Sequence, residues 1–168
     1  NTPLVNRATN GLYRPGSTFK TITSTAALNE SVINENTTFL CQREYKYLDV
    51  TMHCTGYHGN INVVHALEKS CNIFYYNVSQ HLGIDRLVNY EKLFGFGTSP
   101  NIEIGAASGY ISSPETFKKL GIDWTPGQLL QSAIGQSEVT VSPLQMACQA
   151  MTIANKGVRY RPYLVDSI

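Results

Sequence analysis

Ser17 and Lys20 stand three positions apart in the tetrapeptide Ser-Thr-Phe-Lys, and together they could carry out acyl transfer. Residues three apart on a helix share a face, with β-carbons about 5–6 Å apart, so the two side chains can meet. A serine hydroxyl is a weak nucleophile until a base takes its proton, and a lysine kept neutral by burial or nearby positive charge can be that base. At the start of a helix, free backbone N–H groups also favour negative charge. The bare pattern is common, however, and such a serine is often only a helix cap.

A second candidate group is the Ser-Cys-Asn tripeptide at residues 70–72. Helical periodicity is expected on both sides of it, so Ser70 and Asn72 would lie on a loop between two helices. The same Ser-x-Asn pattern at residues 99–101 lies among turn-forming residues and indicates only a turn. From position alone, Ser70 and Asn72 could equally be caps of the helix that follows.

Helical patterns account for most of the chain around these candidates. Asn62 can cap one helix, and Thr125 and Ser142 can cap two more, each followed by proline and by a glutamine three positions on. Too few strand patterns remain to complete a sheet, which predicts one part of a larger α/β domain. The expected helices are 17–29, 62–69, 73–82, 84–94 and those after Thr125 and Ser142, the last running to about 155; the expected strands are 37–40 and 158–164.

Composition excludes several classes of function. The chain has 168 residues, suited to one domain, and 42% of them are hydrophobic. Charged residues make up only 15%, with a formal net charge of +1. This balance favours neither nucleic-acid binding nor a polybasic membrane patch. No apolar run reaches the length needed to span a bilayer.

Three segments resemble the penicillin-binding proteins. Residues 13–20 read Tyr-Arg-Pro-Gly-Ser-Thr-Phe-Lys and closely resemble the segment around the active serine of that family. Residues 66–76 resemble the segment around its second motif, and residues 133–147 resemble its Gly-Gln-Gly segment and the helix after it. In the third segment Ser137 stands where glycine is usual. The resemblance covers nearly the whole chain and implies a class B type D,D-transpeptidase.

The resemblance implies both a fold and a reaction. The fold would be α/β (α+β), serine β-lactamase/transpeptidase-like, represented here mainly by its helical subdomain with an incomplete antiparallel sheet. Ser17 would attack the penultimate D-Ala carbonyl of a peptidoglycan stem peptide, and β-lactams would trap it as an acyl-enzyme. Lys20 would be the base, Ser70 would relay a proton toward Lys20 and the leaving amine, and Asn72 would bind an amide of the acyl chain. Alternatives are a β-lactamase of the same fold, a β-lactam sensor, or an inactive structural member.

The resemblance also implies parts that lie outside this chain. The family's third motif, Lys-Ser/Thr-Gly, is absent, and the family pattern would place it after Ile168. Residues 1–168 are therefore expected to be a partial transpeptidase domain, without the pedestal or the membrane anchor, and to be inactive or nearly so alone. The full-length protein is expected at the extracytoplasmic face of the bacterial cell membrane, with a membrane-embedded glycosyltransferase as partner. Acyl transfer itself needs no cofactor.

The loop before the second motif contains four potential metal ligands: Cys41, Asp49, Cys54 and His58. Two thiolates, an imidazole and a fourth donor could form a tetrahedral zinc site. Asp49 is favoured as fourth donor over His53, because His53 adjoins Cys54 and adjacent side chains tend to diverge. Since the family acts outside the cytoplasm, a Cys41–Cys54 disulfide is an alternative; two free, packed thiols are another. Cys71 and Cys148 are expected to be packing residues.

Overall fold

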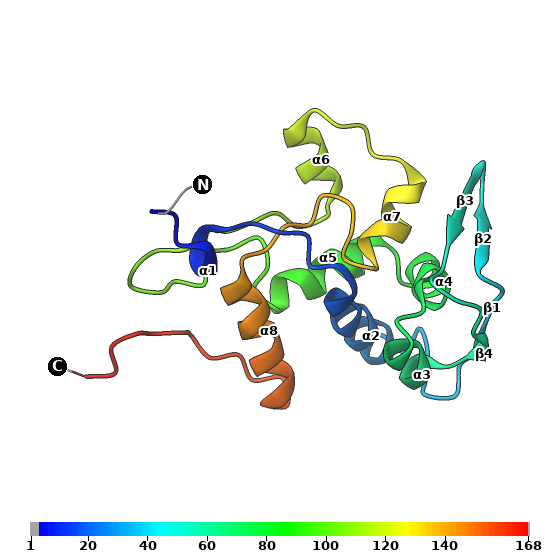
Figure 1. Ribbon diagram of the computed structural model, residues 1–168, viewed down its shortest axis with the longest axis horizontal. Coiled ribbons are helices and arrows are strands. Elements are labelled where there is room, and N and C mark those ends of the chain that lie inside the picture. The colour runs from blue at the N-terminus through cyan, green and yellow to red at the C-terminus, as the bar shows by residue number, and fades with distance from the viewer. Residues whose placement is uncertain (1–3, 168) are drawn as a thin grey trace.

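Helices dominate the computed structural model, which describes residues 4–167 (Figure 1). The helices are α1 (Arg7–Asn10), α2 (Lys20–Asn29), α3 (Val63–Glu68), α4 (Asn72–Leu82), α5 (Ile84–Leu93), α6 (Pro114–Leu120), α7 (Pro126–Ser132) and α8 (Pro143–Ala154). A 3₁₀ turn, η1 (Gly16–Phe19), leads directly into α2. The strands are β1 (Phe39–Cys41), β2 (Glu44–Tyr47), β3 (Val50–His53) and β4 (Gly59–Ile61). The predicted mixed class, mainly helical with small antiparallel sheets, is confirmed.

The strands form two small antiparallel sheets at one end of the molecule, beside α4 (Figure 1). β1 pairs with β4, with Leu40 opposite Asn60, and β2 pairs with β3, with Tyr45 opposite Met52. In this part of the chain only a short strand at 37–40 was predicted, which overlaps β1, so β4 and the β2–β3 hairpin are new elements. The residues of the hairpin alternate weakly between buried and exposed, which explains why the pattern was not recognised.

Two hydrophobic clusters hold these elements together, and α2 contributes to both. One cluster packs α4 against β1, β4 and α7, with Phe74 and Val78 at its centre. The other packs the start of α2 against α5, with Phe19 and Leu87 fully buried. Each large apolar side chain buried in this way contributes about 1.5–3 kcal/mol. The helix that follows the η1 turn is therefore fixed from two sides.

Helix caps follow the sequence at most of the expected places. The Asn62 side chain accepts from the backbone of His65, and Ser142 forms a complete capping box with Gln145. The expected capping box at Thr125 is wrong, because the Thr125 hydroxyl makes no capping hydrogen bond. α6 was not predicted, although Ser113 caps it and proline begins it.

The predicted strand at residues 158–164 is wrong as well. This segment is extended but belongs to no sheet within residues 4–167. Val158, Tyr160 and Leu164 are all more than half exposed. A strand is stabilised by pairing with a neighbour, and none of the described strands lies against this segment.

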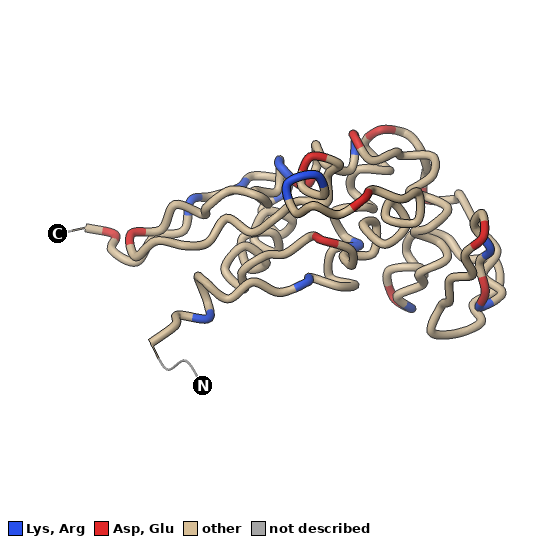
Figure 2. The backbone as a smooth tube through the Cα atoms, turned by 90° about the horizontal axis from the view of Figure 1, so that it is seen from above, with Lys and Arg blue, Asp and Glu red and all other residues tan. Residues whose placement is uncertain are grey.

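Charged residues of both signs are distributed along the chain, without a continuous basic stripe in the view of Figure 2. None of the helices in residues 4–167 is long and apolar enough to cross a membrane.

Candidate active site

Ser17 lies on the η1 turn and Lys20 begins α2. A 3₁₀ helix has three residues per turn, so side chains at i and i+3 lie one above the other. Lys20 Nζ is accordingly 3.2 Å from Ser17 Oγ. The helix expected from Ser17 thus begins with a tighter turn than predicted, and this turn brings the pair closer together. Ser17 is exposed, whereas Lys20 is only 1% exposed.

The loop between α3 and α4 completes the hydrogen-bonded group around Lys20. Lys20 Nζ donates to Ser70 Oγ at 2.9 Å, to the Ser70 carbonyl at 2.8 Å and to Asn72 Oδ1 at 2.7 Å. Ser70 Oγ donates to Ser17 Oγ at 2.8 Å. The structure therefore brings together Ser17, Lys20, Ser70 and Asn72, which are up to 55 positions apart (72 − 17) in the sequence.

The backbone of Ser70 is strained to make these contacts. Its φ is 52°, in the left-handed region that costs a non-glycine residue roughly 1–2 kcal/mol. The preceding helix ends there through hydrogen bonds from the N–H groups of Ser70 and Cys71 back to the last turn of α3. This conformation lets both the carbonyl and the hydroxyl of Ser70 accept from the same amine.

Burial sets the protonation state of Lys20. Removal from water lowers the pKa of the Lys20 amine to about 8, although nearby Cys54 and Cys71 oppose the shift. An appreciable fraction of the amine is therefore neutral near pH 7.5. Only the neutral amine has a lone pair free to accept the proton of Ser17.

An open groove of about 510 Å³ leads to this group. Ser17 and Ser70 lie in it, with Met52 and His53 of β3 on one side and Gln136 also lining it. The His53 carbonyl accepts from Asn72 Nδ2 at 3.3 Å, which ties the hairpin to the hydrogen-bonded group around Lys20. This wall was not expected, because the sequence pattern did not predict β3.

Residues 135–136 pack against the η1 turn that carries Ser17. The Gly135 carbonyl accepts from the N–H of Gly16 at 2.8 Å. A β-carbon at Gly135 would lie 2.3 Å from the Gly16 carbonyl oxygen and 2.5 Å from Phe19 Cβ. Glycine is therefore required where this segment meets the turn that carries Ser17.

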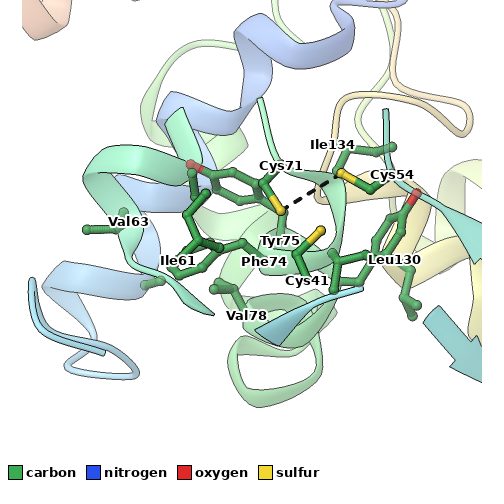
Figure 3. Packing of buried hydrophobic residues seen from close by; sticks show 14 of the residues in the cluster. Cys41, Cys54, Ile61, Val63, Cys71, Phe74, Tyr75, Val78, Leu130 and Ile134 are labelled. Atoms are coloured by element: carbon green, nitrogen blue, oxygen red, sulfur yellow. Dashed lines mark hydrogen bonds between the residues drawn. The ribbon is translucent and has the colours of Figure 1, made fainter. Parts of the chain in front are cut away.

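A second side-chain cluster lies at the hydrophobic core, where Figure 3 shows three of its members, Cys41, Cys54 and Cys71. Its donor atoms all lie within 4.8 Å of one another, and they belong to Cys41, Cys54, His58 and Cys71. His58 Nδ1 is 3.4 Å from Cys41 Sγ and 3.6 Å from Cys54 Sγ, and the Cys54 and Cys71 sulfurs are 3.9 Å apart. All four cysteines of the chain are free thiols, so the structure contains no Cys41–Cys54 disulfide.

The fourth donor differs from the expected one. Asp49 is exposed in the turn between β2 and β3 and does not belong to the cluster. Cys71, expected to be only a packing residue, takes that place. The sequence signal for Cys71 was a thiol next to Ser70 that follows Cys54 and His58 in the chain. Whether its side chain points toward the other donors depends on the conformation of the loop before α4.

The cluster is directly connected to the loop between α3 and α4. Cys54 Sγ accepts from the N–H of Asn72 at 3.3 Å, and Cys71 lies between Ser70 and Asn72. Burial raises the pKa of the Cys54 thiol, but hydrogen bonds from the backbone, that of Gly56 first, outweigh burial and lower it to about 7. Cys54 is thus the thiol of the cluster that most readily becomes a thiolate, the form that binds metals, whereas burial raises the pKa of the Cys71 thiol to about 12.

Comparison with known proteins identifies the family. The penicillin binding protein transpeptidase domain family matches residues 1–168. The chain belongs to this family. It is 37% identical to the peptidoglycan D,D-transpeptidase MrdA of Escherichia coli K12 over 179 aligned residues. That alignment covers 99% of the chain but only 27% of the relative, so the chain spans about a quarter of the relative's length.

Solved structures of penicillin-binding proteins share the same fold. PBP2 of Pseudomonas aeruginosa, in complex with WCK 5153, matches with a TM-score of 0.92 and 32% identity, over 98% of this chain and 39% of that one. Penicillin-binding protein A of M. tuberculosis, as its penicillin G acyl-enzyme, matches with a TM-score of 0.84 and 30% identity, over 99% of this chain and 38% of that one. The predicted serine β-lactamase/transpeptidase-like fold is confirmed.

Proposed function

We propose that the protein containing this chain is a peptidoglycan D,D-transpeptidase, which cross-links stem peptides through an acyl-enzyme on Ser17 and is inhibited by β-lactams. One observation carries the proposal: buried Lys20 is within hydrogen-bond distance of Ser17, Ser70 and Asn72. A nucleophile, its base and a second hydroxyl are thus grouped at the foot of an open groove.

Acylation would begin with proton transfer from Ser17 Oγ to neutral Lys20. The oxygen then attacks the penultimate D-Ala carbonyl and forms the ester, while the C–N bond to the last D-Ala breaks. Ser70 lies 2.8 Å from Ser17 Oγ and 2.9 Å from Lys20 Nζ, so its hydroxyl can pass the proton to the leaving amine. The amine of a neighbouring stem peptide then attacks the ester and restores Ser17.

Asn72 has two roles in this proposal. Its Oδ1 accepts from Lys20 at 2.7 Å and its Nδ2 donates to the His53 carbonyl at 3.3 Å. The first contact orients the base. In the acyl-enzyme, Asn72 Nδ2 would donate to an amide carbonyl of the acyl chain, in place of the His53 carbonyl or in addition to it. The Asn72 carboxamide borders the groove, so it can reach such a carbonyl.

Two competing functions share the catalytic group. A β-lactamase would form the same ester and hydrolyse it rapidly, and a β-lactam sensor would form it as a signal. The similarity to MrdA, named a D,D-transpeptidase, supports cross-linking over both.

The proposal also includes an extracytoplasmic location at the cell membrane and a membrane-embedded glycosyltransferase partner. Penicillin-binding transpeptidases need no cofactor for the acyl transfer itself.

Mass spectrometry of the full-length protein tests the proposal. After incubation with a fluorescent penicillin and digestion, the adduct is expected on the peptide containing Ser17. The variant S99A, altered in the other Ser-x-Asn tripeptide, is expected to be labelled like wild type. No adduct, or an adduct elsewhere, would refute the assignment of Ser17. Release of the adduct within seconds would instead indicate a β-lactamase.

We also propose that Cys41, Cys54, His58 and Cys71 hold a structural Zn²⁺. Three thiolates and one imidazole are a common donor set for tetrahedral structural zinc. Their donor atoms already lie within 4.8 Å of one another, and zinc would separate such tetrahedral donors by about 3.5–4 Å, given ligand distances of about 2.0–2.3 Å. A metal here would fix the loop carrying Ser70 and Asn72, since Cys71 lies between them.

Metal analysis of the purified full-length protein is expected to find about one zinc ion per chain. C54S should lose most of the zinc and lower the melting temperature by more than about 5 °C, because structural zinc contributes directly to folding. C148S is the matched control: Cys148 is also buried but lies outside the cluster, so zinc content should not change. If the protein contains no zinc, and mass spectrometry finds the linked Cys41 and Cys54 peptides two hydrogens lighter than the two free thiols, the disulfide is established instead.

A further inference from the structure

Glu91 of α5 is a fully buried carboxyl that the proposed reaction does not use. Its Oε2 accepts from the N–H of Ser112 at 3.0 Å, whereas its Oε1 is buried with no hydrogen-bond partner. An ionised carboxylate in such surroundings costs several kcal/mol. Burial raises the pKa of Glu91 to about 8, despite the Ser112 N–H and nearby Lys92. Glu91 is therefore mainly a neutral acid near pH 7.

Buried serines continue from Glu91 toward the catalytic group. The Ser112 hydroxyl forms a short hydrogen bond with Ser132 Oγ at the end of α7 and lies 3.3 Å from Ser137 Oγ, so its single proton is shared between these two oxygens. Ser132 Oγ donates to the Gln128 carbonyl at 2.6 Å, and Ser137 Oγ donates to Gln128 Oε1 at 2.8 Å. Ser112 thus links α5 to α7 and to the segment that follows α7.

Ser137 is an unusual residue for its place. Its φ is 64°, a conformation that glycine adopts without strain and serine does not. Both hydrogen bonds of its hydroxyl lie within the buried network, which offsets this strain. The residue before it, Gln136, lines the groove, and the Gly135 carbonyl accepts from Gly16, next to Ser17.

We propose that Glu91 is a positioning residue for acylation: it anchors Ser112, and through Ser112 and Ser137 it holds residues 135–137 against the turn that carries Ser17. The inference rests on the proposed function. Its chemical basis is that a displaced reacting atom is costly, since an error of about 1 Å can slow a reaction about 10²-fold. Loss of the anchor therefore affects the acylation step more than the first, non-covalent binding of a β-lactam.

Three variants of the full-length protein separate this role from general stability. E91Q keeps an oxygen that accepts from Ser112 N–H, and its acylation rate constant should stay within about 3-fold of wild type. E91L removes the acceptor, and the rate constant should fall about 10–100-fold. S112A keeps the backbone bond to Glu91 but removes the hydroxyl links, and it should show a similar fall. E115L, at an exposed position of α6, is the control and should have no effect.

The measurement is stopped-flow binding of a fluorescent penicillin at a temperature well below melting for every variant. It yields the dissociation constant of the first complex and the rate constant of acylation separately. A loss confined to the rate constant, with the dissociation constant within about 3-fold, is the expected result.

Unchanged rate constants in E91L and S112A, with wild type labelled on Ser17, would overturn only the role of Glu91. If E91L does not fold, S112A decides the question. Wild type without labelling would instead refute the proposed function.

Discussion

Replacing Lys20 by methionine is expected to slow acylation of Ser17 by about 10³-fold, within the range that a general base usually contributes. Methionine fills a similar elongated volume but has no nitrogen to accept the Ser17 proton. The hydroxyl of Ser70 would still lie 2.8 Å from Ser17 Oγ, but it has no base behind it. The rate constant for labelling by a fluorescent penicillin measures the loss.

The pH dependence of wild-type acylation tests the same assignment. Burial lowers the pKa of Lys20 to about 8, so the amine is protonated and unable to accept a proton well below that pH. The rate should therefore rise as pH increases through about 8 and then level off. K20M should lack this rise, because the group that titrates is gone.

A matched control separates catalysis from charge. Lys69 also adjoins the catalytic loop, but its side chain is 54% exposed and pairs with Glu68. K69M should keep the rate and the pH profile of wild type. A K20M protein that is acylated at the wild-type rate, with an unchanged melting temperature, would show that another group is the base.

The pair Ser17 and Lys20 could be predicted from the sequence because its geometry is local. Three positions on any helical turn bring the side chains together, and this holds for the 3₁₀ turn that forms as well as for the expected α-helix. The approach of Ser70 to Lys20 is not local. It depends on the packing of α2 against α4, and only the resemblance to a known family indicated it in advance.

The cluster of three cysteines and one histidine shows the limit of reasoning from spacing. Asp49 is nearer to Cys41 and Cys54 in sequence than Cys71 is, yet the β2–β3 hairpin carries Asp49 outward to an exposed turn. Cys71 turns into the core because the loop after α3 reverses at Ser70. Neither event leaves a simple periodic pattern, so sequence proximity favoured the wrong donor.

Strand predictions failed for a related reason. Short strands are stabilised by the partners they pair with, and their own residues carry little information about that pairing, whether the partner is near in sequence or distant. The β2–β3 hairpin was missed although it forms a wall of the groove. Residues 158–164 alternate as a strand should, but none of the described strands pairs with them.

Gly135 is expected to tolerate no side chain. In G135A the new methyl group would lie 2.3 Å from the Gly16 carbonyl oxygen, 2.5 Å from Phe19 Cβ and 2.9 Å from the Gly16 nitrogen. These are backbone atoms and a buried β-carbon, which cannot move aside as a flexible side chain does. The segment must separate from the nucleophile turn, breaking the Gly16–Gly135 hydrogen bond. We expect a loss of about 3 kcal/mol or more, similar to overpacking a core, and acylation slowed about 10²-fold.

Gly121 supplies the control for backbone strain. It has the same φ as Gly135, +68°, but a β-carbon there would have no atom within 4 Å. G121A should therefore cost only the strain of a left-handed alanine, about 1–2 kcal/mol, and leave the acylation rate unchanged. The difference in melting temperature between the two variants isolates the steric contact at Gly135. If G135A and G121A have equal melting temperatures and equal acylation rates, residues 135–136 do not press against the turn carrying Ser17. The positioning role proposed for Glu91 would then be refuted as well, because it depends on that contact.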